Sequence, residues 1–464
     1  MKIKLLFLLL SFTCFHFVQA QITFQKTYGT PKNDYGGSVT HTFDGGYIIS
    51  AIYDSNQTAV IKTDSIGDTT WIKLYPYLTP WTEWNNFITQ LHDSNYVMVG
   101  GTEDSCIYIV KLNQSGDTLW MKKQHDSSHS CGYRQVAEDK EGNLVLVGEA
   151  SVSPTICCSS IFTKMSSTGS QIWSTLVTCP YPNGCRLATV VIDPYNGNYL
   201  VTGDATTYGL PAPRLVELDT AGKKIWDQIY LSYSASIRAI LPRPDSGFVC
   251  AGIGWYSDSL MLFKITKNGN LVKAMDIPET FSLGTNYISI DTATNGYFLA
   301  GQSDVSSSND DFFLSKLDTN YNLLWTQTFG GSQRELFGFM KTTSDGGAVM
   351  VGSTNSFGAG EYDVYLVKTD DNGFLTGQNI ISIAQNSISI SPNPFSQTTI
   401  IKTEKNFSNA ALILYNSLGQ VVRTLNGITG KEFALNRGNL PPGIYLLRIT
   451  QEGKVASSKL IIED

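Results

Sequence analysis

Charged side chains are scarce in this sequence, and segments with a helical pattern are scarcer. Asp, Glu, Lys and Arg make up 16% of the 464 residues, and no window rich in Ala, Glu, Lys and Leu has a helical period. The chain has instead 41 Gly and 23 Tyr. This composition is typical of short strands and tight turns rather than long helices, and the length suits one large domain and one small one.

Long apolar runs are absent after the first twenty residues. Lys2 and Lys4 precede an apolar stretch over residues 5–18, and the small residue Ala20 follows. This order predicts a signal peptide over residues 1–20, cleaved between Ala20 and Gln21; a membrane anchor is the alternative. No later segment has the ~20 apolar residues that cross a bilayer, so we expect no integral membrane segment after cleavage.

Positively charged residues are outnumbered by negatively charged ones in the middle of the chain. The formal net charge is −7, but residues 385–464 carry +3 and the leader carries +2, which leaves about −12 between them. An acidic body argues against nucleic acid and anionic membranes as partners.

Familiar catalytic motifs are missing. The sequence has no His-Glu-x-x-His, no Gly-x-Ser-x-Gly and no phosphate loop, and only four His follow the leader. The Asp370–Gly373 turn lacks the alternating ligands of a calcium loop. We therefore expect no catalytic residue, no metal site and no cofactor, although the many carboxylates leave a glycosidase-type pair open.

A period of about fifty residues runs through residues 21–380. Each copy has four short apolar segments, an inner turn such as Asp345-Gly346-Gly347, and a later turn. The later turns fall at Gly67, Gly116, Gly169, Gly222, Gly269, Asn320 and Gly373. Seven four-stranded copies predict an all-β fold, a seven-bladed β-propeller; an eight-stranded sandwich pair is the alternative.

A Trp follows most of the later turns. It stands four or five residues after the turn, at Trp71, Trp120, Trp173, Trp226 and Trp325. We expect these rings to pack between neighbouring sheets and not to form a site. After Gly269, Val272 and Lys273 stand there instead.

The two ends of the repeat complement each other. The seventh copy lacks its Trp strand, whereas Phe24-Gln-Lys-Thr-Tyr-Gly29 matches Trp325-Thr-Gln-Thr-Phe-Gly330. We expect the N-terminal strand to complete the last blade, which closes the ring and removes two open sheet edges.

Residues 386–464 have a different pattern, of strands broken by Asn, Gly and Pro, which predicts a small Ig-like β-sandwich. Several of its segments resemble the type A C-terminal sorting domain of the type IX secretion system. They are Pro392-Asn-Pro394, Tyr415-Asn-Ser-Leu-Gly419, Leu440-Pro-Pro-Gly-Ile-Tyr445 and Lys459-Leu-Ile-Ile462. The final Glu463 and Asp464 extend beyond the basic tail usual in that family.

This resemblance implies a route and a destination. It implies transport across the outer membrane of a Bacteroidota-type bacterium, with the type IX machinery as partner of residues 386–464. Removal of this module and attachment to surface lipopolysaccharide, or release, would follow. The expected location is therefore secreted or cell-surface, associated with the outer membrane. An ordinary Ig-like accessory domain is the alternative.

Two kinds of function remain open for the propeller. One is a binding module for a glycan or protein; the other is a hydrolase or lyase acting on polysaccharide. The connections after the second strand of each copy and between copies vary most and should share one face, where binding usually resides. Three Trp outside the repeat position, with Tyr256 beside one of them, lie in these connections and are the candidate ligand contacts; local packing over the blade edges is the alternative. They are Trp81, Trp84, Trp255 and Tyr256.

Seven cysteines follow the leader, as suits an oxidising compartment. Cys250 lies within an apolar strand and is expected to be a free core thiol. Cys179 and Cys185 flank a short loop and are the preferred disulfide. Cys131 with Cys157 or Cys158 is the next candidate, and several free thiols are the alternative.

Overall fold

The computed structural model describes residues 21–463 apart from several connections. The connections outside the description are 77, 79–85, 103–105, 126–131, 151–158, 179–184, 208, 246, 256–258, 278–287, 294, 305–309, 376–388, 416–420 and 452–453. One compact unit spans Ile22–Gly377, and a C-terminal unit follows from Gln378. In the described part of both units, every regular element is a β-strand.

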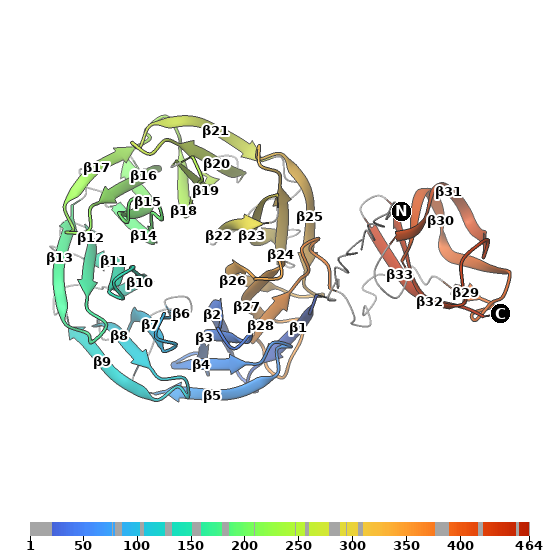
Figure 1. The fold of residues 1–464 in the computed structure, drawn as a ribbon, viewed down its shortest axis with the longest axis horizontal. Coiled ribbons are helices and arrows are strands. Elements are labelled where there is room, and N and C mark those ends of the chain that lie inside the picture. The colour runs from blue at the N-terminus through green and yellow to red at the C-terminus, as the bar shows by residue number, and fades with distance from the viewer. Residues whose placement is uncertain are drawn as a thin grey trace, which may run out of the picture. The chain divides into compact units, whose positions relative to one another are not determined.

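The first unit is a ring of seven four-stranded antiparallel sheets, which confirms the predicted seven-bladed propeller (Figure 1). Blade 1 consists of β2 (Tyr35–His41), β3 (Tyr47–Tyr53), β4 (Gln57–Thr63) and β5 (Thr69–Tyr75). Blade 2 consists of β6 (Phe87–Gln90), β7 (Tyr96–Gly101), β8 (Cys106–Leu112) and β9 (Thr118–His125). Blade 3 consists of β10 (Gly132–Glu138), β11 (Leu144–Ala150), β12 (Ser159–Met165) and β13 (Gln171–Val177).

The remaining blades repeat this order, with the first strand near the centre and the fourth at the rim (Figure 1). Blade 4 consists of β14 (Cys185–Ile192), β15 (Tyr199–Thr207), β16 (Leu210–Leu218) and β17 (Lys224–Ile229). Blade 5 consists of β18 (Ala235–Pro242), β19 (Phe248–Gly254), β20 (Leu260–Ile265) and β21 (Leu271–Ile277). Blade 6 consists of β22 (Ile288–Ala293), β23 (Gly296–Asp304), β24 (Asp310–Leu317) and β25 (Leu323–Phe329).

Blade 7 is built from both ends of the unit. Its first three strands are β26 (Glu335–Thr342), β27 (Ala348–Thr354) and β28 (Asp363–Lys368), and its rim strand is β1 (Phe24–Tyr28). The antiparallel register runs from Phe24 opposite Lys368 to Tyr28 opposite Val364. The N-terminal strand thus occupies the place that its match to the Trp strand predicts.

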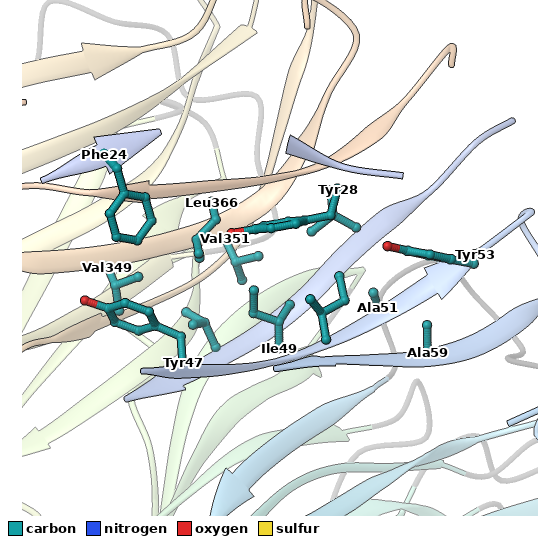
Figure 2. Close-up of a cluster of buried hydrophobic side chains, with 13 residues drawn as sticks. Phe24, Tyr28, Tyr47, Ile49, Ala51, Tyr53, Ala59, Val349, Val351 and Leu366 are labelled. Atoms are coloured by element: carbon teal, nitrogen blue, oxygen red, sulfur yellow. The ribbon is translucent and has the colours of Figure 1, made fainter. Parts of the chain in front are cut away.

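The apolar core is divided among the junctions between blades. Successive residues of a strand point to opposite neighbours: Ile48 packs toward blade 2, and Ile49 packs toward blade 7. Because both faces of a blade are covered, its middle strands are buried at nearly every position, as in β3 and β27. Figure 2 shows the junction between blades 7 and 1, where Phe24 and Tyr28 meet Tyr47, Val349 and Leu366.

A Trp–Gly contact recurs at the rim. A Cβ added to Gly222, the turn glycine of blade 4, would collide with the indole of Trp173 in blade 3, and the indole nitrogen donates to Thr220 O at 3.2 Å. The same contact joins Gly116 to Trp71, Gly169 to Trp120, Gly269 to Trp226 and Gly373 to Trp325, while Phe24 replaces Trp against Gly67. These glycines also have positive φ, so both the turn and the ring contact require glycine. The expected packing role of the Trp residues is confirmed.

At the junction of blades 5 and 6, the large aromatic residue is on the turn and not on the rim strand. The turn residue with positive φ is Tyr321, at 70°, and not Asn320, so the repeat position identified from sequence is one residue too early. Tyr321 is buried and stacks on Tyr297 with ring centroids 5.0 Å apart. Blade 5 has Lys273 where five blades have Trp and blade 7 has Phe24. A large turn residue therefore accompanies the loss of the large rim residue.

The C-terminal unit is a β-structure with its own core. Its strands are β29 (Ser389–Ser391), β30 (Thr398–Tyr415), β31 (Val421–Asn436), β32 (Gly443–Gln451) and β33 (Lys454–Ile462). The sheet order is β29-β30-β32-β33, and β31 pairs with β30. Phe395, Leu412, Tyr445 and Leu460 are among its buried residues.

Candidate ligand-binding face and sorting module

The variable connections of the propeller emerge on one side, which we call the loop face. The connection after the second strand and the connection to the next blade leave from the same end of each antiparallel sheet. The opposite side, the turn face, bears short turns such as Thr42–Gly46, where Thr42 N donates to Gly46 O at 2.8 Å. The two classes of connection therefore share a face, as the repeat predicts.

Trp255 lies on the loop face at the end of β19. Its side chain is 56% exposed, and its backbone N–H donates to Ser234 O at 2.8 Å. Ser234 belongs to the connection between blades 4 and 5, in which Leu231 is 60% exposed. The hydrogen bond ties the two connections together, so that two large apolar side chains are exposed on adjoining loops.

The other aromatic residues of this connection are turned into the propeller. Tyr230 Oη donates to Gly269 O at 2.8 Å, and Tyr233 packs its edge on Phe263 at 5.5 Å between centroids. Because these two rings hold the connection down, the exposure of Leu231 and Trp255 is a property of an anchored loop. We call Leu231 and Trp255 the apolar pair.

A charged cluster lies on β18, the strand that follows this connection. Asp204 Oδ1 accepts from Ser236 Oγ at 2.7 Å and from Arg238 Nη1 at 3.2 Å. Ser236 and Arg238 are two and four residues beyond Ser234. The site thus combines an exposed apolar pair with a mostly buried ion pair at the blade 4–5 junction.

A pair of carboxyl groups, Asp311 and Glu335, occupies the blade 6–7 junction. Glu335 is fully buried and accepts from Gly331 N at 3.1 Å and Thr354 Oγ1 at 2.6 Å. Burial first, and then the Glu335 carboxylate, raise the pKa of Asp311 to about 8. A Cβ on Gly330 would collide with both carboxyl groups, so the backbone closes over them.

A corresponding pair, Asp34 and Asp363, lies beneath Gly29 at the blade 7–1 junction. Asp34 accepts from Asp54 N at 2.9 Å, and Asp363 accepts from Ala359 N at 2.9 Å. Each of these carboxylates therefore holds the backbone of a nearby loop in place. A polysaccharide hydrolase needs carboxylates that a substrate can reach, and these two described pairs do not provide them.

Buried lysines on the turn face are a feature that our sequence analysis missed. Lys62 Nζ lies 2.8 Å from Asp44, the aspartate of the inner turn. Burial opposes ionisation, but the hydrogen bonds from Lys62 and Thr42 hold the pKa of Asp44 at about 2. The same pair recurs as Lys111–Asp93 and Lys368–Asp345, and Lys164 pairs with Asp139, two residues earlier in its turn. The available signal was a Lys near the end of the third strand in six of the seven blades, one blade period apart; blade 4 has Glu217 there.

Of the sequence-predicted ligand contacts, the structure describes Trp255; Trp81, Trp84 and Tyr256 lie outside the described residues. Cys131, Cys157, Cys158 and Cys179 also lie outside them, as does the side chain of Cys185. Their pairing stays a prediction, which peptide mapping under non-reducing conditions tests. Cys250 is a buried free thiol, as expected from its strand.

The described part of the chain forms no group of three or more His, Cys, Asp or Glu side chains suited to a metal ion. Nor does it contain a helix with the length and apolar character to cross a membrane.

Comparison with known proteins identifies the C-terminal unit. Residues 389–463 match the family model of the secretion system C-terminal sorting domain. No curated protein matches the chain.

Solved structures resemble the chain distantly. One is a protein of unknown function from Bacteroides caccae, with 15% identity and a TM-score of 0.35 over 52% of this chain and 81% of that one. Puromycin hydrolase has 10% identity and a TM-score of 0.48 over 79% of this chain and 58% of its own. The WD40 domain of SCAP from fission yeast has 9% identity and a TM-score of 0.39 over 95% and 90%. Because each TM-score is below 0.5, none of them assigns an activity here.

The family match and the sheet order agree on the organisation of the chain. The chain is a seven-bladed β-propeller followed by a secretion system C-terminal sorting domain, and this domain supports export by the type IX pathway.

Proposed function

We propose that this protein is an exported binding protein whose propeller captures a glycan or a protein ligand on the loop face. The apolar pair carries the proposal, because two large apolar side chains are exposed on loops that internal contacts hold in place. Exposed aromatic rings stack on sugars and serve as anchors in protein interfaces. Trp81, Trp84 and Tyr256 extend the proposed surface.

The proposal includes the route of export. Residues 1–20 direct the chain to the periplasm and are removed before Gln21, and residues 386–464 engage the type IX machinery. Removal of the sorting module then leaves the propeller, residues 21–380, on the cell surface, associated with the outer membrane, or released.

Ligand capture by matched variants tests the binding function. A glycan array and affinity capture with the parent propeller identify the ligand, and a parallel hydrolysis assay detects any turnover. Trp255→Ala should weaken capture by about tenfold or more. Phe43→Ala is the control, because Phe43 is 65% exposed but belongs to the turn face. Equal capture by Trp255→Ala and the parent, or equal losses in both variants, would contradict the assignment.

Export is tested by truncation. A chain without residues 386–464 should accumulate in the periplasm of a bacterium with type IX secretion, while surface protein from the parent should lack peptides of that segment. Secretion of the truncated chain at the parental level would overturn the route, and intact C-terminal peptides on surface protein would overturn the removal step.

A further inference from the structure

In the sorting module, the end of β33 is fastened to the segment that precedes β30. Phe395 and Ile462 form a parallel bridge. Phe395 N donates to Ile461 O at 3.0 Å, Glu463 N donates to Phe395 O at 2.9 Å, and Ile461 N donates to Asn393 Oδ1 at 2.7 Å. Since β33 is the last strand in the sheet order, these bonds cover one end of an edge strand.

Arg437 joins this junction to a third segment. Its Nη1 donates to Glu463 O at 3.0 Å and to Ser396 O at 3.4 Å, and its Nε donates to Leu440 O at 2.9 Å. Its backbone N–H donates to Gln397 O at 2.7 Å. A planar guanidinium can serve several carbonyls in fixed directions, which the single ammonium of Lys cannot do in the same way.

Arg423 holds Arg437 without touching the end of β33. Arg423 Nη2 donates to Arg437 O at 2.8 Å, and its Nη1 donates to Asn436 O. Within the described part of the module, Arg423 makes no hydrogen bond to residues 461–463. It therefore offers a matched variant that removes an arginine nearby but leaves the contact to Glu463.

The guanidinium of Arg437 borders solvent and is not part of the hydrophobic core. Residues 396–397 and 437–441 line an open hollow of about 440 Å³ beside it. The core consists of other residues, among them Phe395, Leu412 and Leu460. Truncation of Arg437 should thus loosen the end of β33 without opening a void in the core.

We infer that Arg437 is a positioning residue of the export signal: it holds the end of β33 in the arrangement that the secretion machinery reads. The inference rests on the proposed export route. Residues 389–463 match the sorting domain, and within that match the Arg437 side chain bonds to segments near both ends, at Ser396 and Glu463.

The test uses the full chain in a bacterium with type IX secretion, with Arg437→Ala, Arg437→Lys and Arg423→Ala compared with the parent. Hydrogen exchange on the purified full chains should accelerate about tenfold at the amides of Ile461 and Glu463 in both Arg437 variants, with no change in the propeller strands. The fraction of protein that reaches the surface or the medium should fall by a similar factor in both. Arg423→Ala should stay near the parent in both measurements.

Each contrary result overturns the inference in a different way. Unchanged exchange at Ile461 and Glu463 in Arg437→Ala would show that Arg437 does not hold the strand end. Normal export despite faster exchange would show that the machinery does not read this arrangement. Normal export of Arg437→Lys alone would show that charge suffices. The truncation of residues 386–464 separates these results from a failure of the route, because that chain would be exported only if the route itself were wrong.

Discussion

At the residue scale, the half-buried Asp311 beside the buried Glu335 makes the propeller sensitive to pH. Because the pKa of Asp311 is about 8 in the folded protein, far above the ordinary 3.8, the folded state keeps a proton that the unfolded chain releases. The stability that this proton contributes is complete below about pH 4 and is lost progressively as the pH rises toward 8.

Asp311→Asn should remove this dependence. The amide cannot ionise and still offers a donor to Glu335, so the variant should be more stable than the parent by about 2 kcal/mol at pH 8, a value discounted for the partial exposure of Asp311. The two proteins should differ little at pH 4. Urea unfolding between pH 4 and pH 8 measures both curves, and parallel curves would contradict the prediction.

Residue pairs also mark the limit of what sequence reveals. The buried Asp34 and Asp363 correspond to Glu335 and Asp311, but they meet only because the ring closes, so their contact needed the structure. Lys62 and Asp44, by contrast, lie in one hairpin unit and recur in other blades, so their pairing was open to prediction from the repeat. Trp255 was identified only as a departure from the period; its exposure needed the structure.

At the element scale, the blade 5–6 junction differs from the others in where its aromatic residue stands, on the turn and not on the rim strand. Lys273 stands where other blades have Trp, and Tyr321 stands where they have Gly. Tyr321→Gly alone should lose the buried ring stacked on Tyr297 and cost about 3 kcal/mol, less the relief of a strained positive φ. Lys273→Trp alone should crowd Tyr321 and cost about 1–3 kcal/mol.

The double variant Lys273→Trp, Tyr321→Gly recreates the contact of the other junctions. We expect it to be more stable than the sum of the single effects by about 2 kcal/mol, because each change removes the cause of the other's cost. Chemical denaturation of all four proteins gives the coupling energy. Simple additivity would show that the Trp–Gly contact is not what joins the blades.

At the scale of the whole molecule, closure depends on a five-residue strand. Phe24 and Tyr28 are buried between blades 7 and 1, and Tyr28 Oη donates to Gly67 O at 2.6 Å. Deletion of residues 21–29 should expose the edge of β28 and cause aggregation or a large loss of stability. Deletion of residues 21–23, which precede β1, is the control. A melting temperature within a few degrees of the parent in the longer deletion would refute closure by this strand.

The overall architecture was accessible from sequence for a simple physical reason. A blade cannot bury its two faces alone, so similar turn residues and rim aromatic residues recur at most junctions. Their spacing in the sequence gives the number of blades. At the blade 5–6 junction, where Tyr321 replaces the turn glycine, the sequence placed the repeat turn one residue too early, at Asn320. The contacts of Arg437 could not be predicted, because its guanidinium donates to backbone carbonyl groups, and every residue has one.

The pairing of β1 with β28 also decides how the propeller can be attached to anything else. Phe24, where β1 begins, lies opposite Lys368, where β28 ends, and both lie at the turn-face end of blade 7. The chain therefore enters β1 and leaves β28 on the side of the propeller away from Trp255. Immobilisation through a terminus leaves the loop face open to solution, so a failure to capture ligand in that format would reflect chemistry and not orientation.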